Sequence, residues 1–572
     1  MGACGADAPT GGCHAGGETK GMKSLCGVLV AIMLSSIVTA NGWAQSGTLT
    51  GCTGDCDGDG AVTIDEVLKG VNIALGLAPL HECSAFDCNS DGQVTVDCLV
   101  KAINAALNGC TPAQIQTFEH IVVIVQENRT PDTLFQGLCN APFGSRSSCS
   151  TSPTSSQYNI QTGNWLDKHS PGGTLQPTAV PLANTYDLSH AHSAFVAMCD
   201  PQTLPPALMP VCTMDGAGGI ACSPADQCPP TPQFKFVDNS TGVLNPYLAL
   251  ATQYGWANYM FQTNQGPSFP AHQFLFGGTS APSAADDAAG IFASENMVAG
   301  ATVAGCIAKM TTTVRLITPG GDQSQRIYPC FEHSTMPDVL PALSWRYYAP
   351  SAGSIWTAPN AIQHICQSSG PGGRCVGQDW VENVDLTPAH VLRDIAGCNL
   401  RSLSWVIPTG QNSDHAGAND GGGPSWVASI VNAIGDRTGC DNNAGYWKNT
   451  AILITWDDWG GWYDHEPPPI LAGDQGDYQY GFRVPLIVVS AYTPEAYINN
   501  TPHDFGSILR FIQHNFGVRE GALNFADARA KSDLTEFFDL TQLPRAFQDI
   551  AAPKDLAFFL NDIRPATDPD DQ

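Results

Sequence analysis

The stretch TAILITWDDWGGWYDHEPPP, residues 450–469, decides the fold of this chain. Its first part, 451–456, is rich in aliphatic and β-branched side chains and predicts a strand that is buried on both faces. Two adjacent carboxylates, Asp457 and Asp458, follow this strand and enter a glycine-containing loop. Open α/β sheets bind ligands at the carboxyl ends of their strands, so an acidic pair there predicts a metal site. The alternative interpretation is that Asp457 caps a turn and Asp458 is solvated.

A second apolar run ends in the same way. Residues 120–126 read HIVVIVQ and are followed by Glu127 and Asn128. Carboxylate and amide oxygens are ligands that hard and borderline cations prefer. Because two predicted strands present oxygen ligands at the same kind of position, the sequence predicts one shared cation site on neighbouring strands.

The composition is that of an acidic globular protein. The chain has 572 residues, 43% of them hydrophobic, which is enough for one large domain and a small one. The 53 acidic and 25 basic residues give a formal net charge of −28. Such a charge disfavours binding to nucleic acids and gives no long-range attraction for anionic substrates. A phosphate substrate would therefore have to be held by cations within the site.

The N-terminal segment and the cysteines indicate export. A lysine follows Met22, and after it come an apolar run from Leu25 to Val38 and small residues suited to cleavage, as in a secretory signal. We therefore predict an N-terminal extension and signal peptide over 1–44, with Met22 as the true start, and a secreted or periplasmic protein. Of the 21 cysteines, 18 lie beyond this segment, an even number that suits disulfides in an oxidising compartment. No later apolar run approaches the roughly 20 residues that a membrane span needs, so the mature protein is expected to be soluble.

Residues 52–110 contain an internal repeat. In its first loop, oxygen ligands stand at positions one, three, five and twelve, glycine stands at position six, and position seven supplies a backbone carbonyl, as in an EF-hand. These positions are Asp55, Asp57, Asp59, Glu66, Gly60 and Ala61. The second loop repeats the frame with Asp87, Asn89, Asp91 and Gln93. Cys98 stands there in place of the bidentate carboxylate, so this loop is expected to bind calcium more weakly unless Asp97 substitutes.

This tandem resembles a dockerin-type calcium module, which implies two antiparallel loop-helix units that calcium stabilises. Dockerins dock enzymes onto scaffolds. Six cysteines that are not part of the dockerin pattern are interleaved with the loops, namely Cys52, Cys56, Cys83, Cys88, Cys98 and Cys110. They favour a disulfide-braced calcium spacer that stabilises the chain over a scaffold-docking module.

Three further motifs carry candidate catalytic side chains. His190 and His192 stand two residues apart, so in a strand both would face one side and form a ligand pair. Ser268 lies between two prolines behind a glycine, where a sharply turned backbone would expose its hydroxyl at the start of the next helix, close to N–H groups that favour phosphate oxygens. A helix N-cap is the alternative role for Ser268. Asp414 and His415 follow a predicted strand and precede a glycine-rich loop.

Seven motifs in chain order make residues 118–547 resemble the bacterial phosphoesterase family, which includes phospholipases C and an acid phosphatase and is a branch of the alkaline-phosphatase-like superfamily. The motifs are IVVIVQENR (121–129), DLSH (187–190), GPSFPAH (266–272), SDH (413–415), WDDWGGWYDHEPPP (456–469), GFRVP (481–485) and ADARAKSDLTEFFD (526–539). The resemblance implies an α/β fold with a central, mostly parallel sheet flanked by helices, preceded by the small all-α calcium-binding module. It places the catalytic domain at 118–548 and a C-terminal tail at 549–572.

The resemblance also implies roles for individual residues. One or two divalent ions, zinc or a similar metal, are expected to bind to Glu127, Asn128, Asp457 and Asp458. Ser268 takes the place of the family's nucleophile. Contacts to phosphate oxygens or to the leaving group fall to His190, Asp414 and His415. His465 matches a family position as well, with orientation of its loop as an equal interpretation. The chain departs from the family after the serine, where Ala271 and His272 replace an asparagine and a basic residue.

These assignments predict a secreted, metal-dependent phosphoric-ester hydrolase that forms a phosphoserine on Ser268. Its substrate would be a phosphodiester lipid, as for a phospholipase C, or a phosphomonoester, as for an acid phosphatase. A sulfatase is a less favoured alternative, because the run SFPAH (268–272) echoes the layout Cys/Ser-x-Pro-x-Arg but lacks the arginine. The alternative from another class is a noncatalytic, calcium-braced extracellular binding protein on a degenerate phosphoesterase fold.

Overall fold

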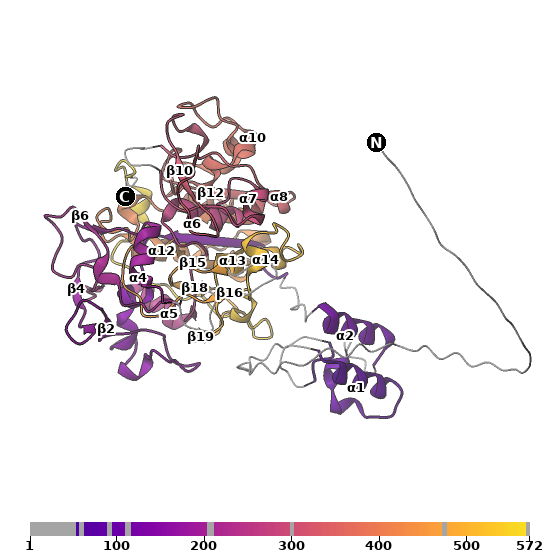
Figure 1. The fold of residues 1–572 in the computed structure, drawn as a ribbon. Coiled ribbons are helices and arrows are strands. Elements are labelled where there is room, and N and C mark those ends of the chain that lie inside the picture. The colour runs from indigo at the N-terminus through magenta and orange to yellow at the C-terminus, as the bar shows by residue number, and fades with distance from the viewer. Residues whose placement is uncertain are drawn as a thin grey trace, which may run out of the picture. The chain divides into compact units, whose positions relative to one another are not determined.

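A computed structural model describes residues 53–56, 62–87, 94–108, 116–202, 211–297, 303–471 and 478–567. The chain divides into two compact units between Thr111 and Pro112. The smaller unit contains helices α1 and α2, and the larger unit contains every strand of the described chain (Figure 1). The domain limits 52–110, 118–548 and 549–572 stay predictions.

The smaller unit is helical in its described part. Its helices α1 (Ile64–Ala74) and α2 (Val96–Asn108) contact each other, and two 3-10 turns, η1 (Leu80–Glu82) and η2 (Ser84–Phe86), lie between them in the chain. Phe86 is fully buried in the small core of this unit. The smaller unit therefore has a core of its own.

Each predicted calcium loop is described only in part. Asp55 and Glu66 are buried. The Glu66 carboxylate accepts hydrogen bonds from the backbone N–H groups of Cys56 and Thr63, both at 2.7 Å, and Cys56 is joined to Cys83 by a disulfide. The predicted ligands that lie outside the described residues are Asp57, Asp59, Ala61, Asn89, Asp91 and Gln93. Calcium binding by this unit therefore stays a prediction.

The larger unit is built around an eight-stranded sheet with the strand order β13-β12-β14-β1-β15-β18-β8-β19. All neighbouring strands are parallel except that β18 runs antiparallel to both β15 and β8. The strands are β1 (His120–Gln126), β8 (Gly255–Ala257), β12 (Trp345–Tyr348), β13 (Val384–Asp385), β14 (Leu403–Val406), β15 (Thr450–Trp456), β18 (Leu486–Val489) and β19 (Tyr497–Asn499). The predicted α/β class with a central, mostly parallel sheet is confirmed.

The two strands that carry the predicted ligands are neighbours in this sheet. β1 and β15 pair in parallel from His120 opposite Thr450 to Gln126 opposite Trp456, and every residue of both strands is buried. Because the last paired positions match, Glu127 and Asp457 leave the sheet side by side. The prediction that both runs form strands buried on both faces is confirmed.

Helices cover both faces of the sheet. Trp456 in β15 pairs three residues further along β1 than Trp405 in β14 does, so the two indoles stand on opposite faces. The Trp405 indole donates to the Leu275 carbonyl of α6 (Ser268–Gly277) at 3.2 Å. Trp456 packs edge-on against Tyr247 of α5 (Asn245–Gln253), with ring centroids 5.1 Å apart. Helices α6 and α5 therefore lie on opposite sides of the sheet.

The other helices pack around these two or cover the connecting segments. α12 contacts α5, and α13 contacts α6. The remaining α-helices are α3 (Pro131–Leu134), α4 (His192–Cys199), α7 (Ala284–Ala288), α8 (Met336–Val339), α9 (Gln363–Cys366), α10 (Gln378–Asn383), α11 (His390–Ala396), α12 (Gly423–Asp436), α13 (Phe505–Asn515), α14 (Ala526–Arg529) and α15 (Leu556–Leu560). None of the helices in the described ranges is long and apolar enough to cross a membrane.

Short strands and disulfides order the long connections. The short strands are β2 (Trp165–Leu166), β3 (Thr174–Leu175), β4 (Thr178–Val180), β5 (Asp187–Leu188), β6 (Cys222–Ser223), β7 (Lys235–Val237), β9 (Phe292–Ala293), β10 (Val314–Ile317), β11 (Arg326–Ile327), β16 (Ile470–Leu471) and β17 (Tyr478–Gln479). The disulfides of this unit are Cys139–Cys149, Cys199–Cys212, Cys222–Cys228, Cys306–Cys330, Cys366–Cys375 and Cys398–Cys440. The predicted use of cysteines in disulfides is confirmed.

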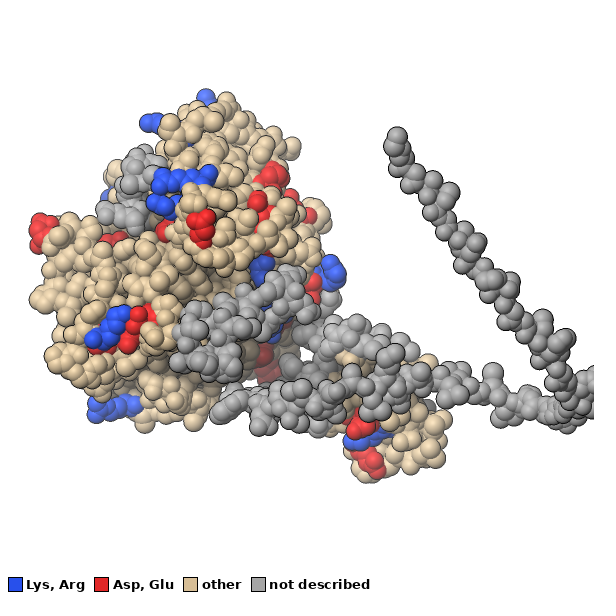
Figure 2. Space-filling model, in the orientation of Figure 1, with Lys and Arg blue, Asp and Glu red and all other residues tan. Residues whose placement is uncertain are grey.

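Charged side chains are sparse on the surface of the larger unit. Asp, Glu, Lys and Arg together make up 14% of the chain. On the face shown in Figure 2, lysines and arginines form small separate groups, several of them next to acidic residues. This face shows no continuous patch of either sign on its described atoms.

Candidate active site

Ser268 is the first residue of α6, and its hydroxyl is directed at the sheet. Its Oγ donates to Asp458 Oδ2 at 3.0 Å, and both residues are fully buried. The helix has Pro267 at its N-cap and no side-chain capping bond. Ser268 therefore does not act as the N-cap. Gly266 gives the preceding turn room, because a Cβ at this position would lie 2.2 Å from the Ser294 carbonyl oxygen.

The two strand ends are joined by backbone contacts. The Asn128 N–H donates to Asp457 Oδ1 at 3.1 Å, across a sequence separation of 329 residues. The Gly460 N–H donates to Asp458 Oδ1 at 2.7 Å. Gly460 has a φ of +64°, and a Cβ here would lie 2.4 Å from the Asn128 carbonyl oxygen. Glycine at this position therefore lets the two loops approach closely.

Glu127, His272 and Asp457 form a buried cluster that can hold a metal ion. His272 Nε2 lies 3.3 Å from Glu127 Oε1 and 3.7 Å from Asp457 Oδ2, and all three side chains are fully buried. One ligand atom from each lies within 4.8 Å of the other two. The structure therefore brings two of the four predicted ligands together with His272.

The other two predicted ligands lie next to this cluster. Asn128 follows Glu127, and Asp458 follows Asp457 and binds the Ser268 hydroxyl. Among the described residues, Asp457 Oδ2 and Asn128 Oδ1 are buried and accept no hydrogen bond. A buried oxygen without a partner is costly, and a cation would satisfy both of them. The donor set therefore fits a divalent metal.

The two predicted phosphate-binding histidines lie close together. The rings of His190 and His415 have centroids 6.1 Å apart. His190 Nδ1 donates to the Leu188 carbonyl at 2.8 Å, and its Nε2 lies 3.2 Å from the Asn128 side-chain amide nitrogen. This Nε2 also lies 4.0 Å from Asp458 Oδ2. His415 Nδ1 donates to the Ala416 carbonyl at 2.7 Å.

Asp414 is bound by groups on the α5 side of the sheet. Its Oδ2 accepts from the Tyr247 hydroxyl at 2.9 Å and from the Trp456 indole at 3.0 Å. Burial raises the pKa of Asp414 to about 6, although the nearby Arg129 guanidinium acts in the opposite direction. These contacts suit a residue that positions Trp456, next to Asp457, and they supply no direct contact between Asp414 and Ser268.

The two histidines at 190 and 192 do not share a strand. β5 ends at Leu188 and α4 starts at His192, so the expected ligand pair is not formed. His192 Nδ1 lies 3.1 Å from the Gln265 carbonyl oxygen, and its ring stacks on Phe195. His192 therefore contacts the segment that leads to Ser268.

His465 belongs to a separate buried network. Its Nδ1 lies 2.6 Å from Asp132 Oδ2 and its Nε2 lies 2.9 Å from Asn159 Oδ1. Burial would lower the pKa of His465, but the Asp132 carboxylate raises it. Arg483 donates to both oxygens of the adjacent Asp464, at 2.8 and 2.9 Å. Of the two interpretations of His465, these contacts favour orientation of the loop.

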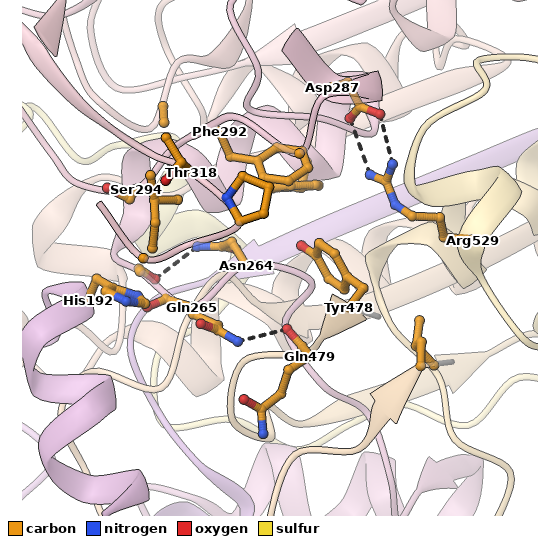
Figure 3. Close-up of a pocket in the computed structure, with 18 of the residues that line it drawn as sticks. His192, Asn264, Gln265, Asp287, Phe292, Ser294, Thr318, Tyr478, Gln479 and Arg529 are labelled. Carbon is orange, nitrogen blue, oxygen red and sulfur yellow. Dashed lines mark hydrogen bonds and ion pairs between the residues drawn. The ribbon is translucent and has the colours of Figure 1, made fainter. Parts of the chain in front are cut away.

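A cavity of about 910 Å³ lies against the segment that leads to Ser268 (Figure 3). Its wall includes His192 and the segment 264–266, and it also includes Phe292, Tyr478 and Arg529. Figure 3 shows Arg529 bound to Asp287, with an N–O distance of 2.8 Å. The residues that line it do not include Ser268 or the predicted metal ligands. The cavity therefore borders the loop 264–266, which precedes Ser268, and does not reach the serine itself.

Sequence reasoning missed several residues that shape this site. Arg129 is fully buried and stacks on Trp462, with 4.6 Å between the guanidinium carbon and the ring centroid. The Tyr347 hydroxyl lies 3.5 Å from His272 Nδ1. Burial raises the pKa of Glu295 to about 7, and its carboxylate accepts the His192 N–H at 3.2 Å. Of these residues, Arg129 alone lay within a recognised motif, IVVIVQENR (121–129).

Comparison with known proteins identifies the class. A model of the Phosphoesterase family matches residues 233–519. The chain belongs to this family. The predicted phosphoesterase resemblance is thereby confirmed.

Individual relatives are phospholipases by name. The chain is 25% identical over 236 residues to the non-hemolytic phospholipase C of Pseudomonas aeruginosa, which is 36% of this chain and 33% of that protein. It is 25% identical over 179 residues to phospholipase C A of Mycobacterium tuberculosis, which is 28% of this chain and 33% of that protein. It is also 25% identical over 154 residues to non-specific phospholipase C1 of Arabidopsis thaliana. The matched part thus spans about a third of the length of these relatives.

Among solved structures, the chain is similar to a protein in the alkaline phosphatase superfamily from Vibrio parahaemolyticus. The similarity covers 53% of this chain and 67% of that chain, at 10% identity and a TM-score of 0.27. A score this low does not establish a common fold. The alkaline-phosphatase-like assignment stays a prediction.

Proposed function

We propose that this protein is a metal-dependent phosphoric-ester hydrolase with Ser268 as its nucleophile. The observation that carries the proposal is the hydrogen bond of 3.0 Å from the Ser268 hydroxyl to Asp458, next to the buried cluster of Glu127, His272 and Asp457. The serine lies at the start of α6, where backbone N–H groups favour phosphate oxygens. Membership of the Phosphoesterase family supports the same reaction class.

Glu127, Asn128, Asp457 and Asp458 would hold the cation, one or two divalent ions such as zinc. When bound, the ion would lower the pKa of the serine hydroxyl and neutralise charge on the phosphoryl oxygens. The chain has a formal net charge of −28, so it offers an anionic substrate no general attraction. The positive charge for phosphate binding must therefore be local.

The residues of the chain account for the remaining steps. Ser268 Oγ attacks phosphorus, a serine–phosphorus bond forms, and the bond to the leaving oxygen breaks. The proton that the serine hydroxyl loses is balanced by the one that the leaving alcohol takes up. Water then attacks phosphorus, the serine–phosphorus bond breaks, the serine regains a proton from that water and the phosphoryl product is released. His190 and His415 would stabilise charge on the phosphoryl group. His190 Nδ1 is engaged by the Leu188 carbonyl, so a phosphate oxygen would be contacted through Nε2, the nitrogen that faces Asn128.

The substrate is a phosphodiester lipid or a phosphomonoester. The relatives named phospholipase C support the first. A secreted or periplasmic location is supported by the six disulfides of the larger unit, because such bonds persist in oxidising compartments. For the N-terminal unit we propose calcium binding in a disulfide-braced spacer, with scaffold docking as the alternative.

Activity assays test the proposal directly. The purified chain, supplied with divalent metals, is expected to hydrolyse phosphatidylcholine or p-nitrophenyl phosphate. Ser268→Ala should lower kcat by about 10³-fold or more while the protein keeps its metal. Ser429→Ala is the matched control, because Ser429 is also a buried helical serine, in α12, and its hydroxyl donates to the Trp426 carbonyl. Wild-type protein with metal bound but no activity on either substrate would favour the noncatalytic binding protein.

A further inference from the structure

His272 stands where the family resemblance leads to a different expectation. The family that the chain resembles has another basic residue at this position. In the structure, however, the imidazole is turned toward two carboxylates. Its Nε2 is 3.3 Å from Glu127 Oε1 and 3.7 Å from Asp457 Oδ2, and the side chain has no exposed surface. Ligands about 2.0–2.2 Å from one ion lie roughly 3–3.5 Å from each other; the 3.3 Å distance falls within this range and the 3.7 Å distance lies just beyond it.

The outer contact of His272 suits one of its two tautomers. The Tyr347 hydroxyl donates its only proton to the Trp356 carbonyl at 2.8 Å. Its oxygen can therefore accept from His272 Nδ1, 3.5 Å away, in the tautomer that carries the ring proton on Nδ1. The lone pair of Nε2 then points toward the two carboxylates. A hydrogen bond to the far nitrogen of a metal-bound histidine orients such rings in general.

Helix α6 carries both the proposed nucleophile and the His272 imidazole. Ser268 and His272 are four residues apart in α6, so both face the ends of β1 and β15. Trp356 stacks on the imidazole with centroids 6.4 Å apart, which limits movement of the ring. The position of His272 is thus set by α6, Tyr347 and Trp356.

We propose that His272 Nε2 is a direct ligand of the active-site cation. The centre is then a mixed nitrogen–oxygen site that prefers Zn²⁺, Fe²⁺ or Co²⁺ to Mg²⁺ and Ca²⁺, because imidazole suits borderline ions and hard ions take oxygen ligands. This inference rests on the proposed metal-dependent function. It adds the identity of a ligand and the class of the ion.

Pulsed electron paramagnetic resonance of the Mn²⁺-loaded full chain tests the ligand without any substitution. Strong coupling to ¹⁴N is expected in the wild-type protein, and in His272→Gln this coupling should disappear. The matched control is His120→Gln, since His120 also lies beside carboxylates, Glu119 and Asp441, but at the opposite end of β1. This control should leave the signal unchanged.

Affinity measurements test the choice of ion. By titration calorimetry, His272→Gln should bind Zn²⁺ about 100-fold more weakly, whereas its affinity for Mg²⁺ should change by less than about threefold. Wild-type protein that binds metal without ¹⁴N coupling would overturn the role of His272 and leave the metal-dependent hydrolase intact. Wild-type protein that binds no divalent ion at this site would overturn both. If His272→Gln fails to fold, the wild-type spectrum alone still decides.

Discussion

Two buried groups in the larger unit have the same composition, two carboxylates and one histidine, but they differ in the source of their positive charge. In the arginine-bound group, made of Asp132, Asp464 and His465, the Arg483 guanidinium donates twice to Asp464 and lies 3.5 Å from Asp132. The second group, which we call the ligand group, is made of Glu127, His272 and Asp457. Among the described residues, Asp457 pairs with His272 and with no lysine or arginine.

This difference separates a structural network from a candidate metal site. A buried carboxylate needs a positive partner, because transfer out of water disfavours its charge. The arginine-bound group has that partner within the chain, so it is complete without any ligand. The ligand group would, under the proposed function, receive its positive charge from a bound divalent ion. The residue types of the two groups do not distinguish them. The position of Arg483 beside one group does.

The largest expected effect comes from removing the Arg483 guanidinium. Arg483→Met should lower the free energy of unfolding by about 3–5 kcal/mol, because Asp132 and Asp464 would be left buried without their partner. Denaturant unfolding of the metal-free protein measures this loss. Arg483→Lys keeps the charge but not the paired hydrogen bonds, so a smaller loss is expected. A loss below about 1 kcal/mol for the methionine variant would show that the comparison is wrong.

A smaller effect on the free energy of unfolding is expected for Asp414, which interacts with the Arg129 guanidinium only through longer-range charge attraction. The pKa of this carboxyl is raised from 3.8 to about 6 by burial, against the influence of Arg129. The folded state therefore binds the proton more tightly than the unfolded state, and this stabilisation is complete below pH 3.8 and is lost as the pH rises through 6. Between pH 4 and pH 7 the wild-type protein should lose about 2–3 kcal/mol that Asp414→Asn does not lose. Equal pH dependence of unfolding in the two proteins would contradict the assignment.

The smallest expected change in stability belongs to the ligand group. Asp457→Asn keeps the side-chain oxygen that accepts from Asn128 and removes a charge that no arginine balances. The metal-free variant should therefore differ from the metal-free wild type by less than about 1 kcal/mol, although its metal affinity falls by about 100-fold. Asp464→Asn is the control from the arginine-bound group and should cost more stability. Calorimetry with and without chelator measures both, and a reversed order would refute the distinction.

The sheet and its ligand-bearing ends were predictable because their signals are local. An apolar run followed by oxygen-bearing side chains marks Glu127 and Asp457, and the register of β1 and β15 then places them together. His272 was predictable in part. Its spacing of four residues from Ser268 puts both on one helical face, and this signal was not used.

Other features depend on contacts that no short pattern contains. The spacing of His190 and His192 predicts a strand pair, but the chain changes to a helix between them. Tyr347 reaches His272 from β12, across a sequence separation of 75 residues. Arg483 lies in a recognised motif, yet its pairing with Asp464 and Asp132 requires the folded arrangement of two loops.

The equal register of β1 and β15 has a consequence for folding. A slip of a single position between these strands would turn the side chains of one of them to the other side of the sheet. Glu127 and Asp457 would then no longer lie together, and the proposed cation site would not form. Uptake of a stoichiometric divalent ion at the proposed site would thus report that two segments made far apart in time on the ribosome have aligned correctly.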